Sequence, residues 1–168
     1  PQGHGRLRAG EWAKGDYLGT EVAGATLGVV GLGRVGQEVA KRMDALGAEI
    51  VAYDPYIGEE RAERLGAELV DLEACLDRAD FLTVHTPLTP ETEGLLSTAE
   101  LERMGGGFLI NCARGGVVDE AALADAVATG PLDGAAVDVF AEEPVAPDNP
   151  LLGVEDVVVT PHLGASTR

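Results

Sequence analysis

The sequence has few cysteines and no long apolar run, and both scarcities exclude classes of protein. Its two cysteines, Cys75 and Cys112, have no second cysteine or histidine at metal-ligand spacing beside them, so neither a disulfide scaffold nor a cysteine-based metal site is expected. We expect two reduced and mostly buried thiols, and therefore a cytoplasmic protein. No apolar run reaches the ~20 residues of a membrane span. The opening residues, PQGHGRLRAGEW, lack the apolar stretch of a secretion signal.

Positive charge is also scarce. The chain has 12 Lys and Arg residues against 29 Asp and Glu residues, and its net charge is −17. Such a charge repels nucleic acid and anionic membrane surfaces, so neither is an expected partner. It also favours hydration and produces a self-repulsion that salt would screen. We hypothesise adaptation to a salty cytoplasm; an ordinary acidic protein is the alternative.

Apolar segments alternate with helical ones along the chain, whose 168 residues suffice for one well-cored domain. Strands are predicted at 26–30, 49–53, 81–85, 107–113, 134–140 and 156–160, with a shorter apolar segment at 67–70. Helices are predicted at 35–46, 59–65, 72–79, 98–104 and 119–130; the fourth begins with a Ser97–Glu100 capping box and the last ends at Gly130. Because the strands are mostly continuously apolar, we predict an α/β fold with a doubly wound, Rossmann-type parallel sheet.

A glycine motif follows the first predicted strand. Gly31, Gly33 and Gly36 have the G-x-G-x-x-G spacing and open the first long helix. The first glycine permits a tight turn, the second lets the backbone approach a pyrophosphate, and the third lets helix and strand pack closely. The helix N-terminus supplies free N–H groups for phosphate. The motif in this context predicts a dinucleotide site.

Asp54 ends the second predicted strand, 18 positions after Gly36. A carboxylate there can accept hydrogen bonds from both ribose hydroxyls of adenosine and repels a 2′-phosphate, so NAD is favoured over NADP. Enzymes that use S-adenosylmethionine also combine a glycine-rich turn with an acidic residue after the second strand. A methyltransferase is therefore the alternative at this point.

The remaining polar candidates also follow predicted strands. Ligands of a doubly wound sheet bind outside the carboxyl ends of its strands, and the residues at those ends are Gly31, Asp54, His85, Thr86, Asn111, Arg114, Asp138 and His162. This common placement predicts a single site.

Three of the candidates could carry a reaction. His162 can accept a proton near neutral pH. Glu143 could orient its ring, and Arg114 could hold a carboxylate or a polarised carbonyl oxygen. Beside a dinucleotide, this combination suits hydride transfer at an alcohol carbon. Glu143 could instead be a solvated acid, and Arg114 could pair with Asp119. His85 is expected to line the cofactor pocket or to be structural, and His4 to have no role.

Several motifs together resemble those of the NAD-dependent D-2-hydroxyacid dehydrogenases. They are GLGRVG, YDP (53–55), HTPLTPET (85–92), NCARGGVVDE (111–120), AAVDVFAEEP (135–144) and TPHLGAST (160–167), in that order. The opening GTEVAGATLGVVGLGRVG, with NCARGG and PHLGAST, is most similar to the members that oxidise 3-phosphoglycerate, the entry to serine biosynthesis. The resemblance covers essentially the whole chain.

The resemblance implies a catalytic trio of Arg114, Glu143 and His162, no metal, and NAD as cofactor. It implies contacts of Arg34 and Val35 with pyrophosphate, of Asp54 with ribose and of Asp138 with the nicotinamide carboxamide. With the residues placed above, the expected cofactor site is Gly31, Gly33, Arg34, Val35, Gly36, Asp54, His85, Thr86, Pro87, Cys112, Ala113, Arg114, Asp138, His162, Gly164 and Ala165.

The resemblance also implies a homodimer or higher homo-oligomer and a second, substrate-binding domain outside this sequence. Residues 1–20 would be a linker and helix leading in from that domain, and residues 21–168 the NAD-binding domain. We expect this chain alone to bind NAD and to turn over a hydroxyacid poorly or not at all. A glycerate, lactate or formate dehydrogenase, and an NAD(H)-sensing corepressor-like module, are the alternatives.

Overall fold

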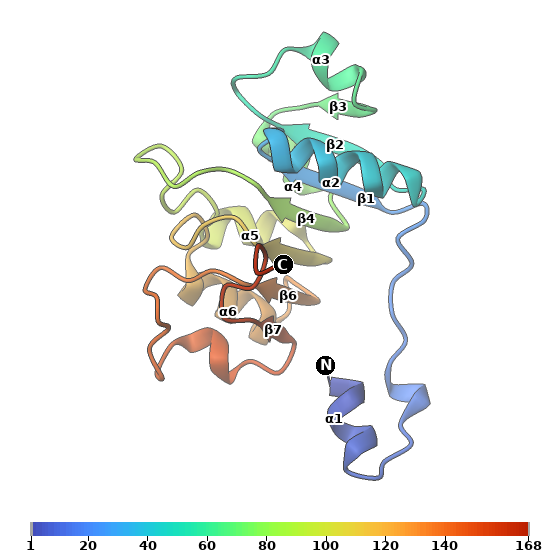
Figure 1. Cartoon of the computed structure of the whole chain (residues 1–168), viewed down its shortest axis with the longest axis vertical. Helices are drawn as coiled ribbons and strands as arrows, with labels where there is room; N and C mark the ends of the chain where they lie inside the picture. Colours follow the sequence, from blue (N-terminus) through green and yellow to red (C-terminus); the bar gives the residue numbers. More distant parts are fainter. Residues whose placement is uncertain (1, 168) are drawn as a thin grey trace.

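A seven-stranded parallel sheet with helices on both faces forms the body of the molecule (Figure 1). The computed structural model describes residues 2–167. The strands are β1 (Thr26–Val30), β2 (Glu49–Tyr53), β3 (Ala67–Leu69), β4 (Phe81–Val84), β5 (Phe108–Asn111), β6 (Gly134–Val137) and β7 (Val157–Val159). Their order is β3-β2-β1-β4-β5-β6-β7, and every pairing is parallel. The predicted doubly wound, Rossmann-type fold is confirmed, and its strand order reverses between β1 and β4, the topological switch point.

Helices cover the two faces in separate groups, and the N-terminal one lies outside the sheet. They are α1 (Gln2–Arg8), α2 (Arg34–Ala45), α3 (Glu59–Glu63), α4 (Leu72–Arg78), α5 (Thr98–Met104) and α6 (Glu120–Thr129), with 3-10 turns η1 (Lys14–Asp16) and η2 (Pro150–Gly153). The predicted capping box is present at α5, where the Ser97 N–H donates to Glu100 at 3.0 Å. Gly130 ends α6 in the left-handed region, with φ of 105°. The turn η2 was not predicted; Asn149 caps it.

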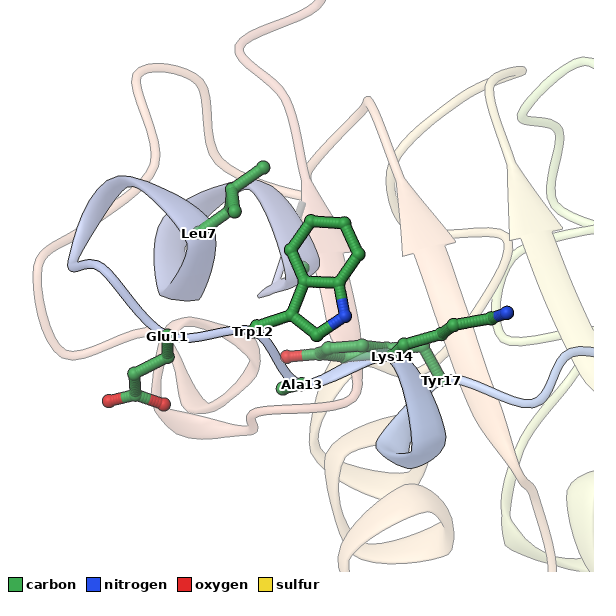
Figure 2. Close-up of a pocket in the computed structure, with 7 residues that line it drawn as sticks. Leu7, Glu11, Trp12, Ala13, Lys14 and Tyr17 are labelled. Atoms are coloured by element: carbon green, nitrogen blue, oxygen red, sulfur yellow. The ribbon is translucent and has the colours of Figure 1, made fainter.

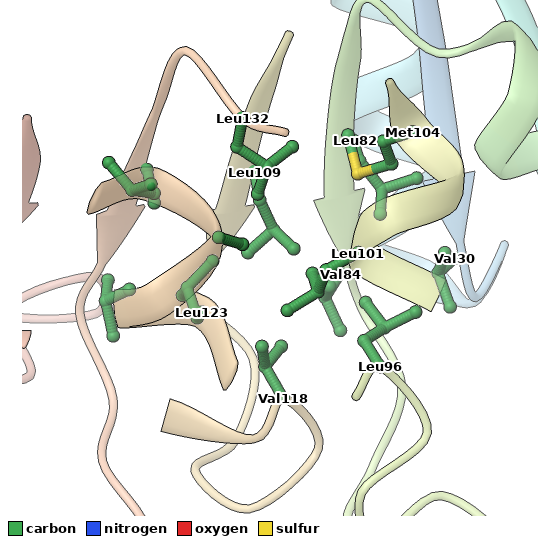
Figure 3. Packing of buried hydrophobic residues seen from close by; sticks show 14 of the residues in the cluster. Val30, Leu82, Val84, Leu96, Leu101, Met104, Leu109, Val118, Leu123 and Leu132 are labelled. Atoms are coloured by element: carbon green, nitrogen blue, oxygen red, sulfur yellow. The ribbon is translucent and has the colours of Figure 1, made fainter. Parts of the chain in front are cut away.

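Alternate side chains of β1 and β2 enter two different cores, and the larger core continues over β4 to β7. Val30, Leu82 and Leu109 point toward α4, α5 and α6, and Figure 3 shows Leu101 and Leu123 of two of these helices packed against them. The neighbouring positions, such as Val29 and Ile50, enter a smaller core beneath α2. Burial on both faces explains why β1 and β2 are continuously apolar in sequence. The second face of β5, β6 and β7 instead borders the large hollow beside the N-terminal residues.

The helix α2 contacts the sheet through small residues. Gly36 and Ala40 are its buried positions, whereas Val35 is 65% exposed. Of the predicted apolar face, Val39 and Met43 pack against the smaller core, and Leu46 is exposed. Small residues let the helix lie close to β1, and its longer apolar side chains then line a cavity beside the sheet.

The N-terminal residues form an arm outside the sheet. Figure 1 shows α1 separated from β1 by an extended stretch, and none of the residues of α1 or η1 is buried. The arm is tied to the β7 end of the sheet where Gln2 Nε2 donates to the Glu155 carbonyl at 2.8 Å. A small apolar hollow lies between α1 and η1, with Trp12 82% exposed beside it (Figure 2). Within residues 2–167, no helix has the length and apolarity required to cross a membrane.

Candidate active site

The carboxyl ends of the strands bring the predicted site residues to one edge of the sheet. The parallel registers pair Val30 with Tyr53 and Val84, and Asn111 with Val84 and Val137. Each of these strand ends is followed within a few residues by a predicted site residue: Gly31, Asp54, His85, Arg114 and Asp138, with His162 following β7. The sheet therefore assembles a single edge from segments scattered over the chain.

The three motif glycines have different surroundings. Gly31 has φ of 95°, which favours glycine. A Cβ at Gly36 would overlap the carbonyl oxygen of Gly31, so only glycine lets α2 lie this close to the turn. A Cβ at Gly33 would meet no atom within 4 Å. The space above Gly33 is thus open for a ligand to approach the backbone, as a pyrophosphate requires.

The Asp54 carboxylate lies against the glycine-rich turn. Its Oδ2 accepts the Leu32 N–H at 2.8 Å, and its Oδ1 accepts the Tyr56 N–H at 2.9 Å. These bonds hold the carboxylate beside the turn without using all of its acceptor capacity, since each ionised oxygen has two lone pairs. The position suits recognition of a ribose next to the bound phosphates.

A cavity of about 580 Å³ extends from the N-terminus of α2 across the ends of β4 and β5. It is lined by Arg34, Val35, His85, Thr86, Pro87, Cys112, Ala113 and Arg114, all of them predicted cofactor residues. The Thr86 hydroxyl is buried and has no hydrogen-bond partner among the described residues. A buried unpartnered hydroxyl and an open glycine backbone fit a polar, extended ligand such as a dinucleotide.

A second cavity of about 550 Å³ adjoins the first and reaches the C-terminal segment. It shares Val35, His85, Cys112 and Arg114 with the first cavity and adds Asp138, His162, Gly164 and Ala165. The structure therefore brings the predicted phosphate-binding and nicotinamide-binding residues to adjoining cavities.

The side chains of Glu143 and His162 are in contact. Oε2 of Glu143 lies 2.8 Å from Nδ1 of His162, and Oε1 accepts the Phe140 N–H at 3.0 Å. The hydrogen bond from His162, with a smaller contribution from the Phe140 N–H, holds the pKa of the Glu143 carboxyl below its usual value. An ionised carboxylate only accepts, so Nδ1 donates to it, and in the neutral imidazole Nε2 then has the free lone pair. The alternative of Glu143 as a merely solvated acid does not describe this geometry.

Asp138 organises the turn that presents His162. Its buried carboxylate accepts the Leu163 and Gly164 N–H groups, both at 2.7 Å, and the Thr160 hydroxyl. Burial acts to raise the pKa of Asp138, but these hydrogen bonds outweigh it and hold the pKa below its usual value. The backbone of His162 has φ of 53°, in the left-handed region. The turn thus holds a histidine in a sparsely populated conformation, as often occurs at functional sites.

Arg114 lies between the cofactor cavities and the histidine. Together with Glu143 and His162 it lines a further hollow of about 290 Å³. In the described part of the chain it has no ion-pair partner; Asp119, the alternative partner, instead caps α6 by accepting the Ala122 N–H at 2.9 Å. Nη1 of Arg114 donates to the Ala113 carbonyl, and the remaining N–H donors of the guanidinium are available to an anionic group in this hollow.

The two cysteines and His85 have distinct environments. Cys75 is buried, and burial raises the pKa of its thiol to about 11. Cys112 is exposed, so the prediction of a buried thiol was wrong for this residue, because β5 ends at the buried Asn111 and the next side chain faces the cavity. His85 lines both cofactor cavities and also contacts the Thr83 hydroxyl at 3.0 Å, and burial lowers its pKa.

Sequence reasoning missed two residues that support this site. Gly115 lies against the Phe140–Ala141 peptide, and Glu120 accepts hydrogen bonds from the loop that carries Glu143. The only sequence signal for Gly115 is that it is the first of two consecutive glycines after Arg114. Nothing in the local sequence indicates Glu120, because its partners lie 21 and 29 positions away.

Comparison with known proteins agrees with this geometry. Residues 1–164 match the family described as D-isomer specific 2-hydroxyacid dehydrogenase, NAD binding domain. The D-3-phosphoglycerate dehydrogenases of Mycobacterium bovis and Archaeoglobus fulgidus are 54% and 49% identical over 99% and 100% of the chain. An NAD-dependent formate dehydrogenase from Staphylococcus aureus, solved in complex with NAD, superposes with a TM-score of 0.90 at 33% identity, covering 99% of this chain and 50% of that one.

The match covers only part of each relative. The chain spans 32% of the length of both curated phosphoglycerate dehydrogenases. A family match over nearly the whole chain, together with the confirmed fold, leaves the methyltransferase alternative without support. The chain belongs to the NAD-binding domains of the D-isomer specific 2-hydroxyacid dehydrogenases.

Proposed function

We propose that this domain holds NAD across its two adjoining cavities. Gly31, Gly33 and Gly36 with the N-terminus of α2 would receive the pyrophosphate, which Arg34 and Val35 would flank, and Asp54 would receive the adenosine ribose. The open backbone at Gly33 and the unpartnered Thr86 hydroxyl support this assignment. The nicotinamide would lie toward the C-terminal turn, against the Asp138, Gly164 and Ala165 end of the second cavity.

The reaction that the site supports best is oxidation or reduction at the hydroxyl-bearing carbon of a D-2-hydroxyacid. NAD, when bound, supplies the hydride acceptor. His162 would take the hydroxyl proton on Nε2, since Nδ1–H donates to Glu143. Glu143 would stabilise the resulting imidazolium, and Arg114 would hold the carboxylate or carbonyl oxygen. The observation that carries this proposal is that these three side chains line one hollow beside the cofactor cavities.

The proposed substrate is 3-phosphoglycerate, oxidised to 3-phosphohydroxypyruvate at the start of serine biosynthesis. The identity to two enzymes named D-3-phosphoglycerate dehydrogenase supports it. Since the chain spans about a third of those enzymes, we assign the groups that grip the substrate's phosphate to a separate substrate-binding domain, with residues 1–20 as the segment that leads in from it.

We further propose a cytoplasmic homodimer or higher homo-oligomer. Trp12 and Leu18 of the arm are 82% and 93% exposed, and Phe81 and Phe108 stack at 5.4 Å in the wall of the large hollow between the arm and the sheet. Burial of these apolar side chains by a second copy would remove them from water. The free Cys75 and Cys112 suit a reducing compartment.

The test of the reaction is a comparison of His162→Ala with the unchanged protein, both carrying a substrate-binding domain. Oxidation of 3-phosphoglycerate should be abolished while the affinity for NAD stays within about threefold, because His162 acts on the substrate proton. Turnover that survives the substitution would refute the assignment of His162 as the base. An NAD affinity that falls in parallel would assign His162 to cofactor binding instead.

A further inference from the structure

Glu120 connects α6 to the loop that carries Glu143. Its Oε1 accepts the Ala141 N–H at 2.6 Å, and its Oε2 accepts Nδ2 of Asn149 at 2.6 Å. One half-buried carboxylate thus fixes two points of the 141–149 segment, one on each side of Glu143. A first-turn acid that only favoured its own helix would not need both oxygens on another segment.

Gly115 contacts the same peptide group. A Cβ at this position would overlap the carbonyl oxygen and carbon of Phe140. Gly115 directly follows Arg114, so the backbone that carries the guanidinium and the backbone that leads to Glu143 touch at this point. Close packing here requires glycine, since any side chain would push the two segments apart.

Phe140 supplies the carbonyl of that peptide group, and its own N–H, in the preceding peptide group, is linked to the reacting groups. The Phe140 N–H donates to Oε1 of Glu143 at 3.0 Å, and the other oxygen of Glu143 contacts His162. A displacement of Phe140 would therefore move the carboxylate that orients the imidazole. The contacts run without a gap from Glu120 through Ala141, Phe140 and Glu143 to His162.

We propose that Glu120 and Gly115 are positioning residues: they fix the Phe140–Ala141 peptide and with it the residue Phe140, whose position sets the geometry of Glu143, His162 and Arg114. The catalytic consequence rests on the proposed function, whereas the mechanical link does not. Neither residue touches the proposed substrate's reacting atoms through its own side chain; both act through the loop.

The test compares Glu120→Ala and Glu120→Gln in the chain itself, by NMR and without substrate. In Glu120→Ala, hydrogen exchange of the Ala141 amide should accelerate about tenfold or more, as expected for loss of a hydrogen bond to a charged acceptor. The pKa of Glu143, followed through its carboxyl carbon, should rise toward that of an ordinary carboxyl. Glu120→Gln keeps one acceptor for Ala141 and should give intermediate values for both.

Asp125→Ala removes another carboxylate from α6, one whose side chain has no hydrogen-bond partner within residues 2–167, and serves as the matched control. This variant should leave the exchange rate of the Ala141 amide and the pKa of Glu143 at their wild-type values. If Glu120→Ala is too unstable to measure, the same two quantities are compared between Glu120→Gln and Asp125→Ala, and a change in Glu120→Gln alone supports the proposal. A wild-type Glu143 pKa and Ala141 exchange rate in the folded Glu120 variant would overturn the proposal. Because neither reading uses NAD or a hydroxyacid, failure here leaves the proposed reaction standing.

Discussion

Glu143 and His162, from the loops after β6 and β7, meet with Oε2 and Nδ1 2.8 Å apart. Both oxygens of Glu143 are engaged, since Oε1 accepts the Phe140 N–H. The imidazole therefore presents only Nε2 to the hollow that it shares with Arg114. This arrangement fixes the ring of an exposed histidine in one orientation, as its proposed role as proton acceptor requires.

Replacement of His162 by Ala should raise the pKa of Glu143 toward the ordinary value of 4.5, since the largest cause of its lowering is the hydrogen bond from His162. A folded-state pKa below the unfolded value gives stability that is present above about pH 4.5 and lost as the pH falls through the folded-state pKa. Carboxyl-carbon NMR titration measures the shift directly. An unchanged Glu143 pKa would show that the two side chains do not interact in solution.

Replacement of Gly33 and of Gly36 by Ala should have different effects, the first on NAD binding and the second on the stability of the domain. Gly33→Ala should weaken NAD binding tenfold or more and change the free energy of unfolding by less than about 0.5 kcal/mol, because its Cβ enters open space. Gly36→Ala should destabilise the domain by about 1–3 kcal/mol, because its Cβ overlaps the Gly31 carbonyl. Calorimetric titration and urea unfolding give the two quantities, and equal effects on stability would contradict this division.

Asp138→Asn should loosen the turn that carries His162. An amide supplies one acceptor oxygen where the carboxylate uses two, and its NH₂ group would face an N–H donor, at a cost of about 1–3 kcal/mol at neutral pH. The depressed pKa of Asp138 gives stability that is present above its ordinary value of 3.8 and lost as the pH falls through the folded-state pKa. Urea unfolding at pH 7 and at pH 3 should therefore show a difference between the two proteins that shrinks in acid. A difference that persists undiminished would assign the loss to packing.

Salt should stabilise the domain if it is adapted to a salty cytoplasm. Ions screen repulsion among the charges that make up the net −17, so the melting temperature should rise from low salt to molar KCl. Sucrose at matched osmolality is the control, because it favours burial without screening charge. A melting temperature that does not change between low and molar KCl would count against the hypothesis and favour an ordinary acidic protein.

The fold was predictable from the sequence because its signals are local. Continuous apolar runs predict buried strands, and the order of strands and helices predicts that their carboxyl ends bring Asp54, Arg114 and His162 to one edge of the sheet. The capping box at Ser97 and the helix stop at Gly130 are equally local.

The support of the site was not predictable in the same way. The Glu120 carboxylate accepts a hydrogen bond from the Ala141 N–H, 21 positions further along the chain. The Asp138 carboxylate accepts hydrogen bonds from residues 22 to 26 positions further along. The pattern of apolar residues in the sequence does not indicate such contacts, because they depend on how the loops after β5, β6 and β7 pack. The exposure of Cys112 was missed for the same reason: the exact end of β5 decides which way that side chain faces.

The central claim is that this edge of the sheet binds NAD through the glycine-rich turn and Asp54. The most direct test is calorimetric titration of the chain with NAD and NADP, on the unchanged protein and on Asp54→Asn. We predict NAD binding at least about tenfold tighter than NADP binding, a difference of ~1.4 kcal/mol, and a smaller ratio in the variant, because the carboxylate both accepts ribose hydroxyls and repels a 2′-phosphate. Absence of NAD binding, or equal affinity for both dinucleotides in the unchanged protein, would contradict the claim.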